Sequence, residues 1–145
     1  RFPLKAGEVS EAQIRTAFEE QIRALEHAGV DLLILETFTY LEELILAIET
    51  ARETAPDLSV VAQMVFPSQG RTATGINALT CAEAAIEAGA SVFGSNCGRG
   101  VKAMLSAIER LSVLKDRIPL SAFPNAGLPE VLGQRTVYSA QPAYM

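Results

Sequence analysis

Four short apolar runs recur along this chain about every 30 residues, and helical patterns fill the intervals between them. The runs cover residues 31–35, 59–66, 91–94 and 118–123. None alternates cleanly between apolar and polar residues, which is typical of strands buried on both faces of a parallel sheet. The repeat therefore predicts an α/β fold made of consecutive βα units with right-handed crossovers.

The intervals carry local signals for helices. Apolar residues recur at helical spacing from Ile14, Leu41 and Val101 onward, and a fourth, alanine-rich helix is expected over residues 80–88. Gly29 and Gly89 each stand between a helix and a strand, where a left-handed conformation ends a helix. Three pairs of residues have the spacing of a capping box, which predicts three helix starts: Ser10 with Gln13, Thr39 with Glu42, and Thr80 with Glu83.

A parallel sheet of this kind closes either as an open doubly wound sheet or as a (β/α)₈ TIM barrel. No Gly-x-Gly-x-x-Gly follows a strand, so the main dinucleotide-binding signature is missing. Polar residues at successive strand ends favour the barrel, whose active site gathers at that face, but a barrel needs about 250 residues. The chain has 145. We therefore expect residues 1–145 to be part of one barrel domain, covering about four central βα units.

Charge and composition bear on partners and location. The chain has 17 acidic and 12 basic side chains and a net charge of −5, which argues against a nucleic-acid partner. Its longest apolar runs, such as residues 32–35, are too short to span a membrane. Two cysteines are too few for a disulfide scaffold and indicate a reducing compartment, so we expect a cytoplasmic protein.

Three strand ends carry residues suited to chemistry. Glu36 follows Leu-Leu-Ile-Leu, where it can bind an ammonium group or act as a base, or merely complement the dipole of the next helix. Cys97 lies in Gly-Ser-Asn-Cys-Gly-Arg-Gly beside the start of a helix, a setting that favours the thiolate, which binds zinc or attacks electrophiles. Asn125, in Pro-Asn-Ala-Gly, is either a turn residue or an amide offered to a ligand.

Two other residues have structural explanations. Cys81 falls in the first turn of a predicted helix capped by Thr80, without a histidine or cysteine at metal-ligand spacing, so packing explains it better than chemistry. His27 is the single histidine and lies near a helix C-terminus, where a cation is favourable. A Cys–His nucleophile pair therefore has little support.

Together, the motifs GVDLLILETF (29–38), GSNC (94–97) and PNAG (124–127) resemble the homocysteine S-methyltransferase family. That family includes the homocysteine-binding domain of cobalamin-dependent methionine synthase and betaine–homocysteine methyltransferase, and the PNAG form is closer to the methionine-synthase-like branch. The resemblance implies a (β/α)₈ barrel of which this chain holds the fourth to seventh strands. The first three strands and the last strand are missing, and residues 138–145 resemble the stretch leading toward the last one.

The resemblance also implies a function, namely transfer of a methyl group to the homocysteine thiolate to give methionine. Members bind zinc through three cysteine thiolates, and Cys97 corresponds to one of them. The other two form a Gly-Gly-Cys-Cys-Gly motif, which this chain lacks. Glu36 would hold the homocysteine amino group, Asn96 would shape the same site, and Asn125 is a weaker candidate. The methyl donor stays open, and cobalamin or methylfolate would be carried by other domains.

Two other hypotheses remain beside this one. The chain could be a non-catalytic half-barrel module that associates, with itself or with its missing half, through open sheet edges. It could also belong to an unrelated barrel enzyme that uses Glu36 as a general base. We further expect that this chain alone does not bind zinc tightly, since Cys97 by itself is one ligand of three. Further domains of a modular enzyme, or a homo-oligomer, are the expected protein partners.

Overall fold

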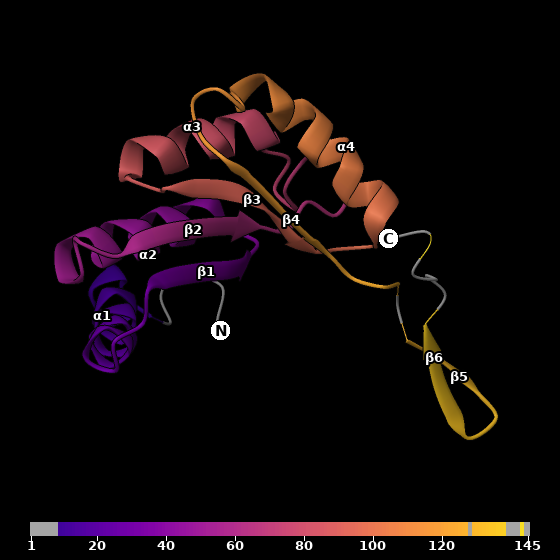
Figure 1. Ribbon diagram of the computed structural model, residues 1–145, viewed down its shortest axis with the longest axis horizontal. Coiled ribbons are helices and arrows are strands. Elements are labelled where there is room, and N and C mark those ends of the chain that lie inside the picture. Colours follow the sequence, from indigo (N-terminus) through magenta and orange to yellow (C-terminus); the bar gives the residue numbers. More distant parts are fainter. Residues whose placement is uncertain (1–8, 128, 139–142, 144–145) are drawn as a thin grey trace.

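The computed structural model describes residues 9–127, 129–138 and 143, and it contains one parallel sheet with the strand order β1-β2-β3-β4 (Figure 1). Each strand overlaps one of the four apolar runs of the sequence. The strands are β1 (Leu32–Phe38), β2 (Ser59–Met64), β3 (Val92–Cys97) and β4 (Leu120–Pro124). Because all three strand pairings are parallel, the carboxyl ends of the four strands lie along one edge of the sheet.

Helices alternate with these strands and pack against one another in chain order. Gly29 and Gly89 follow the first and third helices with positive φ angles of 79° and 104°, as the sequence predicts. Within the described residues, no helix is both long and apolar enough to cross a membrane. The helices are α1 (Glu11–His27), α2 (Leu41–Thr54), α3 (Ala78–Ala88) and α4 (Val101–Leu111), the last followed by a short 3₁₀ turn, η1 (Ser112–Leu114).

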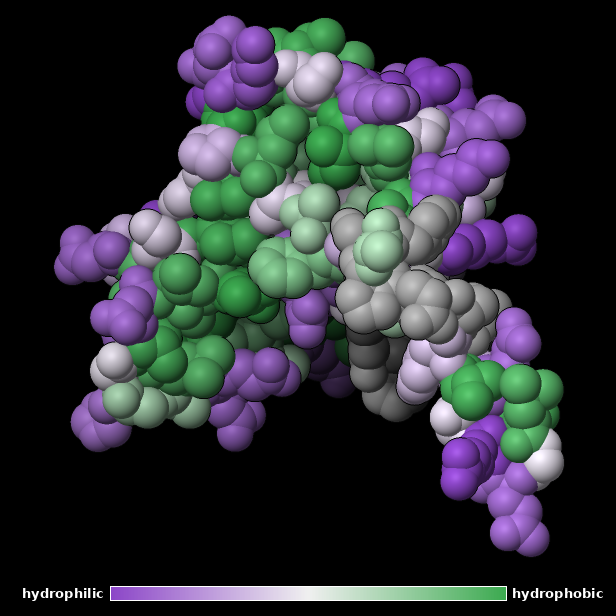
Figure 2. All heavy atoms as spheres, turned by 45° about the vertical axis from the view of Figure 1, so that its right-hand side comes forward, coloured by the Kyte–Doolittle hydropathy of each residue, from purple (hydrophilic) through white to green (hydrophobic). Residues whose placement is uncertain are grey.

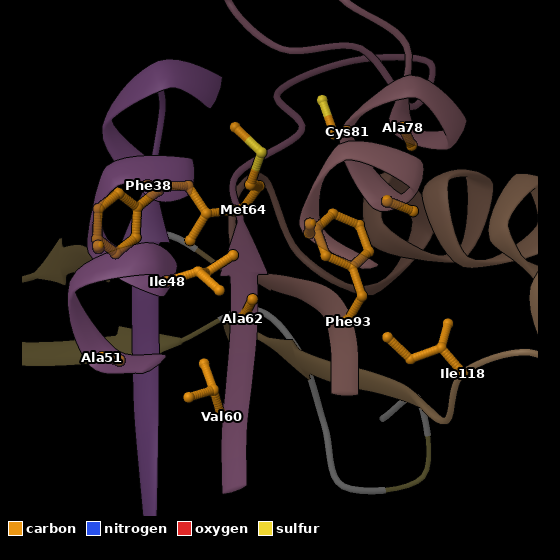
Figure 3. Close-up of a cluster of buried hydrophobic side chains, with 14 of the residues drawn as sticks. Phe38, Ile48, Ala51, Val60, Ala62, Met64, Ala78, Cys81, Phe93 and Ile118 are labelled. Atoms are coloured by element: carbon orange, nitrogen blue, oxygen red, sulfur yellow. The ribbon is translucent and has the colours of Figure 1, made fainter. Parts of the chain in front are cut away.

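The core lies between the helices and one face of the sheet. Its fully buried side chains include Leu44 and Ile48 of α2, Met64 of β2 and Phe93 of β3. Figure 3 shows Ile48, Met64 and Phe93 converging between the strands and the helices. Burying such a side chain contributes about 1.5–3 kcal/mol, so this layer holds the strands at their mutual positions.

The structure confirms one of the three predicted helix starts. Ser10 and Gln13 form the expected capping box at α1. The prediction for α2 is wrong, because Tyr40 precedes this helix without a side-chain cap and acidic residues in the first turn offset the helix dipole instead. The prediction that Thr80 caps α3 is wrong, because Asn77 caps this helix three residues earlier. The Asn77 side chain, which is as good an acceptor as threonine, accepts a hydrogen bond from the Thr80 backbone N–H at 2.9 Å.

Burial on both faces of every strand is a further expectation that the structure does not meet. Ile34 of β1 is 52% exposed and Phe123 of β4 is 59% exposed. Both belong to the outermost strands. Leu33 and Leu120, one and three positions before them, pack in the core, and because successive side chains of a strand alternate in direction, Ile34 and Phe123 point away from the helices. An apolar run indicates that both faces of a strand can be buried, but it does not indicate whether other elements among the described residues cover the second face.

A β-hairpin that the sequence analysis does not predict follows β4. Strands β5 (Pro129–Leu132) and β6 (Arg135–Tyr138) pair antiparallel around Gly133, which has a positive φ of 65°. Val131 is 74% exposed, and Figure 2 shows hydrophobic side chains on a hairpin that stands away from the body. Residues 138–145, which the resemblance places before the last barrel strand, lie outside the described residues apart from Tyr138 and Ala143.

Candidate functional site

Three of the four predicted site residues come together at the carboxyl edge of the sheet. Glu36 lies near the end of β1, and Asn96 and Cys97 end β3, so β2 separates them. The Asn96 side chain, 2% exposed, bridges this gap: its Nδ2 lies 3.2 Å from Glu36 Oε2 and 3.4 Å from Cys97 Sγ. The nitrogen of one amide thus lies within hydrogen-bond distance of both a carboxylate and a thiol.

Thr37 completes this cluster, although the sequence analysis does not single it out. Its backbone N–H donates to Asn96 Oδ1 at 2.8 Å, and its Oγ1 accepts from Asn96 Nδ2 at 2.6 Å. The same hydroxyl lies 3.7 Å from Cys97 Sγ. The available signal was a hydroxyl residue directly after a strand-end glutamate, which by itself does not predict contacts with residues of another strand.

The backbone leaves the extended conformation at both strand ends. Thr37 has a φ of 63° and Cys97 a φ of 60°, and Gln69 is the third non-glycine residue of the described chain with a positive φ. This region is unfavourable for side chains with a Cβ, most of all for a β-branched residue, at a cost of order 1–3 kcal/mol. Two of the three such residues therefore lie in one hydrogen-bonded cluster.

The Glu36 side chain is accessible, and it also lines a groove of about 490 Å³ between α1 and β1. Apolar side chains of both elements, such as Phe18 and Ile34, make most of the other walls. No strand of the described residues pairs with β1 on this side. A carboxylate that is half surrounded by apolar surface, yet open, is suited to bind a ligand cation.

Asn125 does not join the cluster through any hydrogen bond among the described residues. Its Nδ2 donates to the backbone carbonyl of Gly98 at 3.2 Å, in the loop that follows Cys97. Asn125 itself does not have a positive φ, whereas Gly127 does, at 93°. Its amide therefore holds the loop beside Cys97, and a direct contact with a ligand remains a prediction.

Cys81 and His27 have structural explanations in the fold, as predicted, and need no catalytic or metal-binding role. Cys81 is fully buried in α3, and burial, followed by the nearby charge of Glu42, raises the pKa of its thiol to about 12. Figure 3 shows Cys81 on α3 among the labelled side chains of the hydrophobic core. It is the fourth residue of its helix, since α3 begins at Ala78. His27 lies in the last turn of α1, as predicted.

The sequence pattern also does not predict a polar contact that lies beneath the cluster. Gln63 of β2 is 1% exposed, and its Nε2 donates to Ser121 Oγ of β4 at 2.8 Å, across β3. The strand between them passes at Gly94, where a Cβ atom would lie 1.9 Å from the Ser121 backbone oxygen. A glycine in a strand signals such a close approach, but it does not name the approaching residue.

The side chains near Cys97 bear on the prediction that this residue is one ligand of a zinc ion. Cys97 supplies a sulfur at the site, the kind of ligand that zinc prefers. Across residues 9–127, 129–138 and 143, however, no three or more histidine, cysteine, aspartate or glutamate side chains are grouped to hold a metal ion. A complete zinc centre would therefore need ligands that these residues do not supply.

The fold and the strand-end cluster define a parallel α/β protein with a thiol and a carboxylate at the carboxyl edge of its sheet. Comparison with known families then gives its relationship: a family model described as homocysteine S-methyltransferase matches residues 3–145, and the chain belongs to this family. This membership favours the first of the three hypotheses over an unrelated barrel enzyme.

Curated relatives from both branches of the family match the chain. The S-methylmethionine–homocysteine S-methyltransferase of Pongo abelii is 33% identical over 112 residues, 77% of this chain and 30% of the relative. The betaine–homocysteine S-methyltransferase 1 of Sus scrofa is 33% identical over 88 residues, 61% of this chain and 31% of the relative. Methionine synthase of Mycobacterium tuberculosis is 30% identical over 133 residues, 89% of this chain and 11% of the relative.

Solved structures agree with the predicted fold class. The apo form of the homocysteine methyltransferase MmuM from Escherichia coli has a TM-score of 0.74 at 21% identity, covering 86% of this chain and 47% of that one. Its metallated form gives 0.73 at 20% identity, covering 84% and 42%. The chain thus spans less than half the length of each of these proteins, and its four βα units are part of a (β/α)₈ barrel fold.

Proposed function

We propose that the protein is a homocysteine S-methyltransferase and that the Glu36–Asn96–Cys97 cluster is part of its substrate site. The observation that carries the proposal is that Asn96 Nδ2 lies 3.2 Å from the carboxylate of Glu36 and 3.4 Å from the thiol of Cys97. Family membership supplies the reaction class, and the cluster supplies groups suited to an amino-acid thiol.

Each residue then has a defined part in binding. The accessible Glu36 carboxylate accepts hydrogen bonds from the α-ammonium group of homocysteine, and such charge-assisted bonds are about twice as strong as neutral ones. The Asn96 amide nitrogen lies within hydrogen-bond distance of both that carboxylate and the Cys97 sulfur. In the reaction, the homocysteine thiol loses its proton, its sulfur forms a bond to the methyl carbon, and the bond between that carbon and the donor breaks.

Zinc dependence is part of the proposal. Cys97 would supply one thiolate ligand, and the remaining ligands would come from outside the described residues. A bound zinc ion lowers the pKa of a thiol at its open position and so favours the nucleophilic thiolate near neutral pH. The metallated MmuM structure is in keeping with a metal in this family.

The proposal extends to the location of the enzyme and to its partners. Two cysteines are too few for a disulfide scaffold, and on that basis we place the protein in the cytoplasm. The similarity to methionine synthase, of which the chain spans 11%, makes further domains plausible partners. The methyl donor stays open, because the relatives that match are named for different donors.

The test is methylation of homocysteine by the full-length protein, with S-methylmethionine, betaine, methylcobalamin and methylfolate offered in turn. Glu36→Gln removes the charge that binds the ammonium, so we expect the KM for homocysteine to rise by about 10- to 100-fold. Glu87→Gln, the same exchange at an exposed position of α3, should leave KM unchanged. Absence of methylation with every donor, or an unchanged KM in Glu36→Gln, would contradict the proposal.

A further inference from the structure

Thr37 occupies an irregular position that the proposed roles of Glu36 in substrate binding and of Cys97 as a zinc ligand do not explain. In the pairing of β1 with β2, Leu35 lies opposite Ala62 and Phe38 opposite Met64, so β1 holds one extra residue between these pairs. Such a bulge redirects the side chains beside it. Thr37 lies within it at a φ of 63°, a conformation that a β-branched residue adopts only when its surroundings impose it.

This backbone conformation determines which way the Asn96 amide faces. The oxygen and nitrogen of an asparagine amide are nearly equivalent in shape, so their placement follows from the partners. A backbone N–H can only donate, and the Thr37 N–H therefore requires the oxygen, Oδ1, on its side at 2.8 Å. The Thr37 hydroxyl then accepts from the opposite end of the amide, Nδ2, at 2.6 Å. One residue thus holds both ends of the Asn96 amide.

Counting hydrogens shows what the hydroxyl adds. Asn96 Nδ2 carries two hydrogens and faces three acceptors, of which Thr37 Oγ1 is the nearest. The second hydrogen is left for Glu36 Oε2 or Cys97 Sγ. Because the Thr37 oxygen already accepts a bond, its own hydrogen can be donated to Cys97 Sγ, 3.7 Å away. The hydroxyl can therefore serve the thiol while the amide serves the carboxylate.

We propose that Thr37 is a positioning residue of the homocysteine site, which orients the Asn96 amide so that Glu36 is held in place to receive the substrate ammonium. This inference rests on the proposed function. Thr37 acts through Asn96 and does not touch the substrate. Its unfavourable backbone conformation is the arrangement that brings its N–H and its hydroxyl to the two ends of one amide.

The kinetic test uses Thr37→Val in the full-length protein, which keeps the branched shape and removes the hydroxyl. We expect the KM for homocysteine to rise about 3- to 10-fold, the effect of one hydrogen bond, with kcat changed by less than about two-fold. Thr37→Ser restores the hydroxyl and should return KM to within about two-fold of wild type. Thr50→Val is the matched control, because Thr50 bonds its own helix in α2, away from the site.

The second readout does not depend on activity. In the wild-type protein, the hydrogens of the Asn96 side-chain amide should exchange slowly with solvent in ¹H–¹⁵N NMR spectra, because the side chain is buried and Nδ2 donates to the Thr37 hydroxyl. Thr37→Val should exchange them faster, and Thr37→Ser and Thr50→Val should preserve the slow exchange. Thr37→Ala, which lacks both the hydroxyl and the branch, replaces Thr37→Val if the latter does not fold.

The proposal requires both changes in the same variant. A higher KM with unchanged amide exchange would overturn it, as would faster exchange with an unchanged KM, because the hydroxyl would then not act on the substrate through Asn96. If the wild-type protein does not methylate homocysteine with any of the four donors, the proposed function fails. The exchange rates then decide alone whether Thr37 orients Asn96, and unchanged exchange in Thr37→Val would overturn that as well.

Discussion

At the scale of single residues, the two cysteines differ by environment and not by chemistry. Cys97 ends a strand, is half-buried and shares hydrogen bonds with Thr37 and Asn96. Cys81 is fully buried among apolar side chains of α3 and its neighbours. A thiol without access to solvent or to a partner charge is inert, so Cys97 is the one of the two thiols that is open to a ligand.

The burial of Cys81 predicts a dependence of stability on pH. Its thiol pKa is about 12 in the folded protein and 9.0 without the fold, so above about pH 9 the unfolded chain binds fewer protons than the native one. We expect the free energy of unfolding to fall as pH rises from about 9 to 12, by up to roughly 1.4 kcal/mol per pH unit. Denaturant unfolding measures this loss.

Cys81→Ala is the comparison for that measurement, because other side chains also ionise in alkaline solution. The variant is expected to be less stable at neutral pH, since it leaves a cavity, but its stability should fall less steeply above pH 9. Parallel pH profiles of the two proteins would show that the Cys81 thiol is not protected by the fold.

At the scale of elements, the positions of helix ends depend on competition between neighbouring capping residues. For α3 the spacing of Thr80 and Glu83 indicates one start, while Asn77 caps the helix three residues earlier. Either start is compatible with local preference, since asparagine and threonine both accept from the backbone. The earlier start is the one that places Ala78, Cys81 and Ala82 together in the core, and this burial decides between them.

Substituting the two caps separates these alternatives. Asn77→Ala removes the acceptor for the Thr80 N–H and should lower the free energy of unfolding by about 1 kcal/mol. Thr80→Ala lies inside the helix at an exposed position and should change stability by less than about 0.5 kcal/mol. A larger loss in Thr80→Ala than in Asn77→Ala, measured by urea unfolding, would assign the cap to Thr80.

The element order itself was predictable from the sequence. Periodicity and glycine positions act within a few residues, which is the range of the forces that begin and end helices and strands. The hairpin of β5 and β6 was not predicted, because its strands are short, exposed and mixed in polarity. Without a core face to fill, such strands lack the apolar pattern by which a strand is recognised.

At the scale of the whole molecule, the described sheet ends at β1 on one side and at β4 on the other. Exposed apolar residues on these two strands, Ile34 and Phe123, lie on the face away from the helices. Open edges and exposed apolar surface favour association with further strands. Whether those strands complete a catalytic barrel or belong to another copy, as the half-barrel hypothesis holds, stays a prediction.

The metal site also belongs to this scale, because its ligands would come from separate parts of a barrel. For the isolated chain of 145 residues we expect no zinc binding at nanomolar affinity, since one thiolate makes an incomplete site. Competition with a chromophoric chelator measures this affinity, and Cys81→Ser and Cys97→Ser are the paired variants. One tightly bound zinc per chain, lost in Cys97→Ser alone, would refute the expectation.

The sequence by itself determined the order of helices and strands, the parallel sheet and the identity of the strand-end residues. These depend on periodicity and on residue type, which are local properties. Only the tertiary structure decided that Asn96 meets Glu36, 60 positions earlier, and that Thr37 holds both ends of its amide. Such contacts depend on the register between strands and on a bulge in β1, which are set when the strands pair and the helices pack against them.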